Sequence, residues 1–172
     1  MDDQERDRIR GYLRAQAAKL TPAEVIDKVL TAMADLRRAA VAVPKDRFEE
    51  RPAPGEWSGH EVMAHVVDIG RHFGDQVVDI LEGRPRRTAT REPSTTTGRP
   101  ADEWSAILER DRAALFDRVR RADPTQALTE TIEHRMFGPL TWREVLLFTR
   151  LHDLDHVGQL QQIGAALAAH PA

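Results

Sequence analysis

Two histidines near the end of the chain stand at a spacing that suits metal chemistry. His152 and His156 are four residues apart, so on a helix their imidazoles lie on one side, one turn apart and within reach of a single ion. His65 lies on the apolar side of a separate predicted helix. Helices of a bundle can aim side chains at one interior point. The three imidazoles could therefore form a catalytic metal site with open positions for a nucleophile or substrate.

The spacing alone leaves a second interpretation open. Each histidine could be buried separately, donating to a backbone carbonyl or a carboxylate without doing chemistry. The chain contains no cysteine, which excludes disulfides, thiolate ligands and cysteine nucleophiles, so a metal would have to bind nitrogen and oxygen. The other histidines are interpreted as structural: His60, His72, His134 and His170.

Polar side chains within one turn of these histidines are further candidates. Asp68, three residues after the first histidine, could orient that ligand or act as a catalytic base, and is equally well explained as a solvated helix carboxylate. Gln159 could hydrogen-bond to His156, three residues before it, or satisfy a backbone group. Asp153 and Asp155 lie about 100° round the helix from the histidines they adjoin, so we expect them to face neighbouring helices or solvent.

Hydrophobic residues at a period near 3.6 predict five helices, over residues 2–20, 22–43, 58–83, 102–122 and 141–168. Capping boxes, in which Ser or Thr precedes Glu by three residues, begin three of them at Thr21, Ser58 and Thr141. At about 1.5 Å per residue the four later helices are roughly 30–40 Å long. These dimensions predict an all-α fold, a four-helix bundle with crossover connections plus an additional N-terminal helix.

We expect an N-terminal amphipathic helix at residues 1–20, followed by one bundle domain at residues 21–170. The connection at 84–100 is rich in Arg, Pro and Thr, which predicts an exposed, mobile segment. Residues 128–140 predict an irregular stretch with a short extended piece. Tryptophans that stand where helices begin, Trp57 and Trp142, are interpreted as packing anchors rather than pocket walls.

The composition narrows the classes of partner. The 25 basic and 28 acidic residues give a formal charge of −3, which indicates no general attraction to nucleic acid or to an anionic membrane. No apolar run approaches the roughly 20 residues of a membrane-spanning helix, and the N-terminus lacks the layout of a signal peptide. We therefore expect a cytoplasmic protein that acts on a small-molecule substrate.

One helix carries more apolar residues than a single buried stripe needs. Val67, Val78 and Leu81 lie off the main stripe, beside Gly70 and Gly74, where another helix could approach closely. We expect a homodimer to cover this face, with the N-terminal helix as the alternative cover.

Four ordered motifs resemble the DinB/YfiT-like superfamily of metalloenzymes over residues 22 to about 165. They are Pro-Gly-Glu-Trp-Ser at 54–58, Glu-Val-Met-Ala-His at 61–65, Phe-Gly-Pro-Leu-Thr-Trp-Arg-Glu at 137–144 and His-Asp-Leu-Asp-His-Val-Gly-Gln-Leu at 152–160. The resemblance implies a four-helix bundle in which His65, His152 and His156 hold a divalent ion such as zinc or nickel. Imidazole suits several such metals.

The resemblance also implies a class of chemistry. Proteins similar to this chain include thiol-dependent S-transferases, a thiol-dependent maleylpyruvate isomerase and metal-dependent hydrolases, and a metal can stabilise a thiol or water as the anion. The chain has no thiol of its own, which fits a low-molecular-weight thiol cosubstrate and fits a hydrolase equally well. The remaining alternative is a non-catalytic, stress-linked binding or dimerisation module, which needs no cavity beside the histidines.

Overall fold

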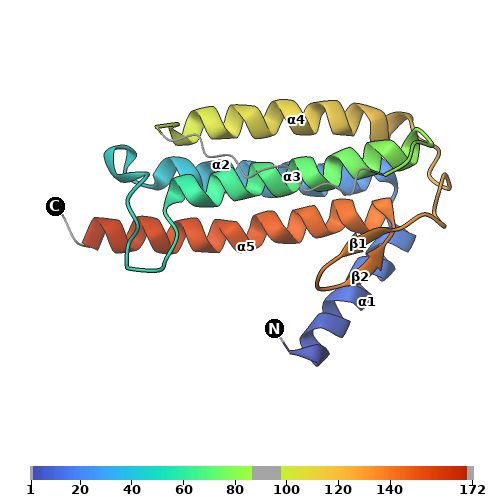
Figure 1. Cartoon of the computed structure of the whole chain (residues 1–172), viewed down its shortest axis with the longest axis horizontal. Coiled ribbons are helices and arrows are strands. Elements are labelled where there is room, and N and C mark those ends of the chain that lie inside the picture. Colours follow the sequence, from blue (N-terminus) through green and yellow to red (C-terminus); the bar gives the residue numbers. More distant parts are fainter. Residues whose placement is uncertain (1, 87–97, 170–172) are drawn as a thin grey trace.

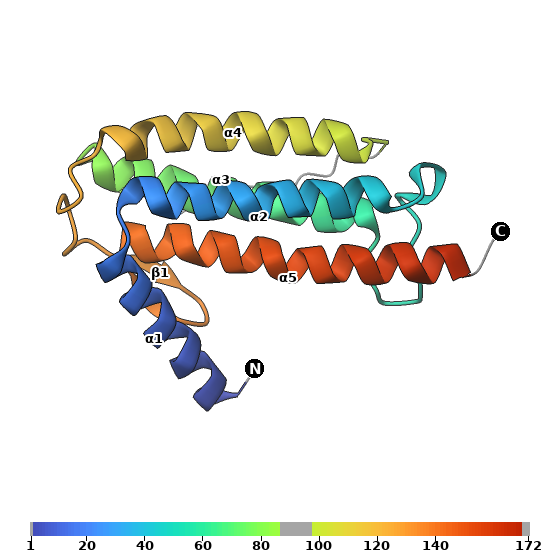
Figure 2. The same ribbon diagram turned by 180° about the vertical axis from the view of Figure 1, so that it is seen from behind.

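Four long helices form the body of the protein. The computed structural model describes residues 2–86 and 98–169 (Figure 1). In chain order the helices and strands are α1 Asp3–Lys19, α2 Pro22–Ala42, a short 3-10 helix Lys45–Arg47, α3 Gly59–Leu81, α4 Ala101–Arg121, β1 Ile132–His134, β2 Gly138–Leu140 and α5 Trp142–Ala169. Helices α2 to α5 lie side by side, and α1 leaves them at an angle (Figures 1 and 2). The predicted all-α fold is confirmed.

Reciprocal side-chain caps begin three of the helices, as the sequence predicts. The Thr21 hydroxyl accepts a hydrogen bond from the Glu24 backbone N–H at 3.3 Å, and the Glu24 carboxylate accepts one from the Thr21 N–H at 2.7 Å. The same pairs form at Ser58 and Glu61 before α3, and at Thr141 and Glu144 before α5. Helices α3 and α5 carry the candidate histidines, and these caps fix the residue at which each of the two helices begins.

The helices pack in the cyclic order α2, α5, α3, α4. Helices α3 and α4 run in the same direction, so the connection between them joins opposite ends of the bundle (Figure 1). Most of the connection predicted to be mobile, residues 87–97, lies outside the described residues. The second long connection, between α4 and α5, stays at one end of the bundle and contains the two strands.

Helix α4 covers the apolar face that suggested a dimer. Val67 and Leu81 are buried within the chain. A Cβ atom placed on Gly74 would stand 3.4 Å from Leu115 Cδ2, and one on Gly70 would stand 3.8 Å from Leu108 Cδ1. Val78, on the same face, is half-buried. Helix α4 therefore supplies most of the cover. The homodimer stays a prediction, which a mass measurement against the 19.4 kDa of one chain tests.

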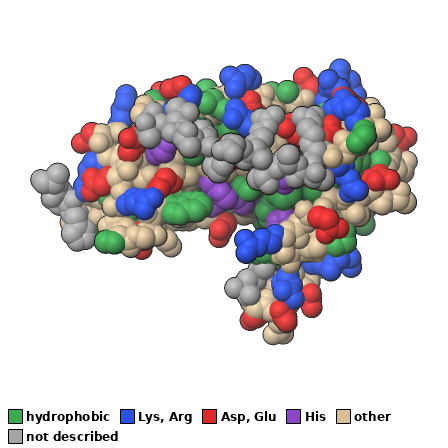
Figure 3. All heavy atoms as spheres, in the orientation of Figure 1, with side chains coloured by type: hydrophobic (Ala, Val, Ile, Leu, Met, Phe, Trp, Pro, Cys, Tyr) green, Lys and Arg blue, Asp and Glu red, His purple; other side chains and the backbone are tan. Residues whose placement is uncertain are grey.

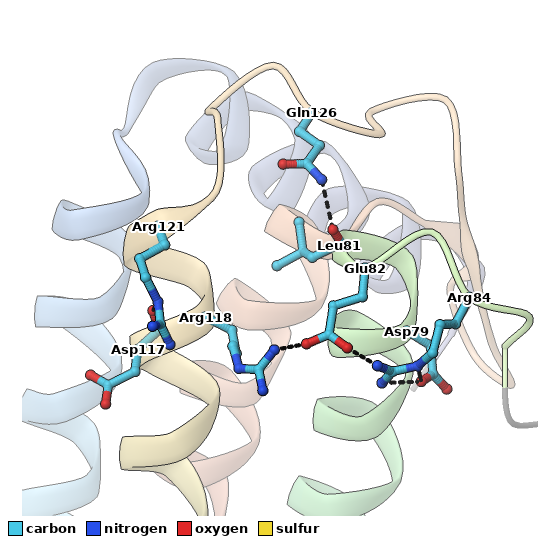
Figure 4. A network of polar contacts seen from close by, with 8 residues as sticks. All are labelled: Asp79, Leu81, Glu82, Arg84, Asp117, Arg118, Arg121 and Gln126. Atoms are coloured by element: carbon cyan, nitrogen blue, oxygen red, sulfur yellow. Dashed lines mark hydrogen bonds and ion pairs between the residues drawn. The ribbon is translucent and has the colours of Figure 1, made fainter.

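Polar contacts tie the C-terminal end of α3 to α4 and to the connection that follows α4 (Figure 4). The Glu82 carboxylate pairs with Arg118 of α4 and with Arg84. Arg84 also reaches Asp79, with 2.8 Å between the guanidinium and the carboxylate. The Gln126 side chain donates to the Leu81 carbonyl oxygen at 2.7 Å.

A short hairpin and α1 flank one end of the bundle (Figure 2). Strands β1 and β2 are antiparallel, with Ile132 opposite Leu140, which confirms the predicted extended piece. Gly138 closes the turn with φ of +67°, a left-handed conformation that glycine adopts without steric cost. Leu13 of α1 is fully buried, and α1 packs against α5. Among the described residues no helix is both long and apolar enough to cross a membrane.

Candidate metal centre

The structure brings the three predicted histidines together. His65 comes from α3, and His152 and His156 come from consecutive turns of α5. His152 Nε2 lies 3.2 Å from the Nε2 atom of each of the other two. One possible ligand atom from each ring lies within 4.8 Å of the others. Capped helices packed side by side thus direct three imidazole nitrogens to one point.

The donor set fits a divalent ion. Nitrogens bound at 2.0–2.1 Å around a tetrahedral metal lie about 3.3 Å from one another, close to the two 3.2 Å separations from His152 Nε2, and all three candidate ligand atoms lie within 4.8 Å of one another. Gln159 Oε1 is 2.7 Å from His156 Nδ1, and an amide oxygen can only accept, so Nδ1 carries the proton. This hydrogen bond leaves a lone pair on His156 Nε2, which faces the other two histidines. Gln159 therefore orients a candidate ligand.

Burial keeps His65 and His152 in the neutral form that binds metals. Desolvation lowers the pKa of His152 to about 2, with further lowering by His156, His65 and Arg112. Desolvation also lowers the pKa of His65, assisted by His156 and opposed by the nearby Asp68 carboxylate. Neutral imidazole offers a lone pair, whereas imidazolium does not. At neutral pH these two imidazoles can therefore bind a cation without first losing a proton.

A large open cleft of about 1670 Å³ lies over the histidines. Its walls come from α1, the segment before α3, α3 itself, the hairpin and α5. On the face shown in Figure 3, histidine side chains gather near the middle with hydrophobic side chains beside them. A small molecule could thus approach the histidine nitrogens directly.

Trp57 forms part of the cleft wall, so its interpretation as a packing anchor is wrong. Trp57 is 39% exposed, and its ring lies nearly parallel to the His156 ring at 6.4 Å and meets the His65 ring edge-on at 5.1 Å. Trp142 is fully buried and donates from Nε1 to the Gln126 carbonyl oxygen at 2.8 Å. Both tryptophans stand where helices begin, and only the packing around them separates the two roles.

The three acidic residues near the histidines differ in burial and in what they face. Asp68 is half-buried and lines the cleft one turn after His65. Asp155 also lines the cleft but is exposed. Asp153 is fully buried and points to α4, where both its oxygens bond to the Arg112 guanidinium, one of them at 2.7 Å. Asp153 therefore faces a neighbouring helix, as the helical spacing predicts.

Three other histidines are held by contacts outside the cluster. His60 Nδ1 accepts from Trp104 Nε1 at 3.3 Å. His72 lies 3.1 Å from the Gln76 amide nitrogen. His134 Nδ1 lies 3.2 Å from the backbone nitrogens of two residues in the hairpin turn. All three line the cleft. His72 stands seven residues after His65, a helical spacing that allows both to line one face, whereas no spacing in the sequence indicates this position for His60 and His134. His170 lies outside the described residues.

Comparison with known families and structures gives a consistent result. A sequence profile described as the DinB superfamily matches residues 28–160. The crystal structure of a four-helix bundle protein shares 20% sequence identity, with a TM-score of 0.63, and covers 83% of this chain and 99% of its own. None of the curated proteins compared with the chain matches it significantly.

A second solved structure is a histidine-to-alanine mutant of the mycothiol-dependent maleylpyruvate isomerase. It is 14% identical to this chain, with a TM-score of 0.63, and covers 84% of it. The match spans 62% of that longer protein. At these identities the two likenesses show the shared four-helix-bundle fold.

Proposed function

The chain belongs to the DinB superfamily, and we propose that it is a metal-dependent enzyme in which His65, His152 and His156 hold a divalent ion. The convergence of three imidazole nitrogens beneath a large cleft carries this proposal. A zinc or nickel ion bound there would lower the pKa of a thiol or of water and so supply a nucleophile near neutral pH.

The residues around the ligands have separate tasks. Gln159 fixes the proton of His156 on Nδ1, so that Nε2 can bind the ion. Asp68, one turn from His65 in the wall of the cleft, accepts the proton that the nucleophile loses. Trp57 covers one side of the cluster with its ring and limits access of water there.

A thiol cosubstrate and water remain two candidates for the nucleophile. A thiol-dependent transferase is the first choice, because a protein of the same fold is a mycothiol-dependent isomerase and because this chain brings no cysteine of its own. A metal-dependent hydrolase would use the same ligands. The cleft beside the histidines favours either enzyme over a non-catalytic binding module, which would need no such space.

A thiol-dependence assay tests the proposal. Protein loaded with Zn²⁺ or Ni²⁺ is mixed with a small thiol and a chromogenic aryl halide, and separately with a chromogenic ester. We expect metal-dependent thiol transfer in the wild type, loss in His152→Ala, and retention in His72→Ala. His72 is the matched control because it lines the same cleft but lies outside the three-histidine cluster. Ester cleavage without thiol transfer would support the hydrolase, and neither activity in any metal-loaded form would contradict the enzyme proposal.

A further inference from the structure

The cleft has an apolar end that the proposed chemistry does not use. Along α5 this end lies before the two histidines, and along α3 it lies after His65. Trp57 stands at the opposite end, beside His156. We call this end the apolar recess. The apolar residues that line it are Ile9, Ile69, Phe73, Phe137, Phe148 and Leu151. The charged Glu133 and Arg135 of the hairpin line the same cleft.

Stacked rings form one surface of the recess. The His134 ring lies between Phe73, at 5.4 Å and 21°, and Phe137, at 4.9 Å and 23°. Phe148 meets the same imidazole at 4.3 Å and 60°. The His134 Nδ1 atom accepts the backbone N–H groups of Met136 and Phe137 at 3.2 Å each, which fixes the ring in place. Burial lowers the pKa of His134, so at neutral pH the stack is uncharged. Phe73, His134 and Phe137 are themselves buried, and the half-buried Phe148 ring offers the larger apolar surface to the cleft.

The recess is continuous with the histidine cluster. The Phe148 ring centre lies 5.6 Å from that of His152, and both side chains line the same cleft. A small molecule with an apolar ring a few bonds from its reactive group would therefore contact the aromatic stack while that group reaches the three histidine nitrogens.

Helix α1 supplies a wall of the recess through Ile9. This helix, Asp3–Lys19, lies outside residues 28–160, the part of the chain that the superfamily profile matches. Buried Leu13 and Ala17 anchor it to the same hydrophobic core as Phe73 and Phe137. The wall is thus packed onto the core through these two residues, and it comes from a part of the chain outside the matched region.

From these contacts we propose that the apolar recess binds an aromatic group of the substrate, and that Ile9 of α1 and Phe148 of α5 determine this specificity. The proposal rests on the proposed function, since it assigns the substrate class of the same site. It identifies the substrate as a small molecule that carries an aromatic ring beside its reactive group. Burying a ring of this size in an apolar site strengthens binding by roughly tenfold or more.

Two probes of different length test this assignment on the zinc-loaded protein. Acetohydroxamate binds a metal without a ring, and phenylacetohydroxamate adds a phenyl group. Calorimetry should show phenylacetohydroxamate binding at least about tenfold more tightly to the wild type. This preference, the ratio of the two dissociation constants, should shrink about fivefold or more in Ile9→Gln and in Phe148→Leu.

Matched controls separate the recess from general loss of packing. Phe116→Leu and Ile107→Gln make the same changes in α4, at residues outside the cleft, and should keep the wild-type preference. Equal binding of the two hydroxamates to the zinc-loaded wild type, or equal preferences in Phe148→Leu and Phe116→Leu, would overturn the recess and leave the proposed function standing.

Metal-free protein supplies a test that does not depend on the ion. Benzyl alcohol should shift the backbone amide resonances of the hairpin and of α1 in the wild type, and these shifts should shrink in Phe148→Leu. If zinc fails to bind but these shifts are present, the proposed function fails and the aromatic recess stands. If benzyl alcohol shifts none of these resonances, the proposal that the recess binds an aromatic group is wrong.

Discussion

The ion pair between Arg112 and Asp153 crosses the interior of the bundle and bears directly on the candidate metal centre. Arg112 of α4 is 4% exposed and Asp153 of α5 is 0% exposed. Two guanidinium nitrogens bond to the two carboxylate oxygens. Asp153 also follows His152 directly in the chain, so a shift of this carboxylate would move a proposed metal ligand.

Removing one partner should therefore be costly. Arg112→Met leaves a buried carboxylate without its counter-charge, and such losses destabilise proteins by about 3–5 kcal/mol. The paired change Arg112→Met with Asp153→Leu removes both charges and should recover most of that loss, because apolar side chains of similar volume can replace a buried pair. The exposed pair Arg37 and Glu109, 3.0 Å apart, serves as control, and Arg37→Met should cost less than about 1 kcal/mol.

Urea denaturation followed by circular dichroism measures all four proteins. The reasoning predicts a drop in the free energy of unfolding for Arg112→Met that is several times the drop for Arg37→Met, with recovery in the double variant. A loss below about 1 kcal/mol in Arg112→Met would show that the pair does not hold α4 and α5 together. If the double variant is as unstable as Arg112→Met, the loss comes from packing around the arginine stem rather than from the unpaired carboxylate.

Three further predictions follow from single contacts. Burial lowers the pKa of His152 to about 2. Below the ordinary histidine pKa of about 6.5, His152 therefore binds a proton in the unfolded chain but not in the folded metal-free protein. Between pH 7 and 5 the wild type should lose about 2 kcal/mol more unfolding free energy than His152→Ala, and equal losses in the two proteins would refute this. Gln159→Leu removes the hydrogen bond that orients His156 and should weaken metal binding by about 10–100-fold in calorimetry with unchanged helical content, whereas unaltered affinity would remove Gln159 from the site. Ser58→Ala removes the cap of α3 and should lower the unfolding free energy measured in urea by about 1 kcal/mol. A urea denaturation curve identical to that of the wild type would contradict this.

The sequence predicts the helices well because local signals mark their ends. Thr21, Ser58 and Thr141 each begin a helix by the capping box seen in the chain. The four-residue spacing of His152 and His156 places both on one face of α5 without knowledge of the rest of the fold. The position of His65 on an apolar stripe places it in the same bundle interior, but spacing alone allows three separately buried histidines. The resemblance to the DinB/YfiT-like superfamily is what assigns all three to one ion.

Other features depend on contacts between elements distant in the sequence. The helical spacing directs Asp153 to a neighbouring helix or to solvent and gives no sign that Arg112 is its partner, since that pairing depends on the depth at which α4 packs. The ring of His134 between Phe73 and Phe137 requires the hairpin to fold against α3. Trp57 has the local signals of a packing anchor, and only the open cleft beside it reveals its role as a wall.

Calorimetric titration of metal-free protein with Zn²⁺ or Ni²⁺ tests the central claim most directly. With His65, His152 and His156 as ligands, the wild type should bind one ion per chain, His152→Ala should bind it at least about a hundredfold more weakly, and His72→Ala should match the wild type. Absence of binding to the wild type, or equal affinities in the wild type and His152→Ala, would contradict a three-histidine metal centre.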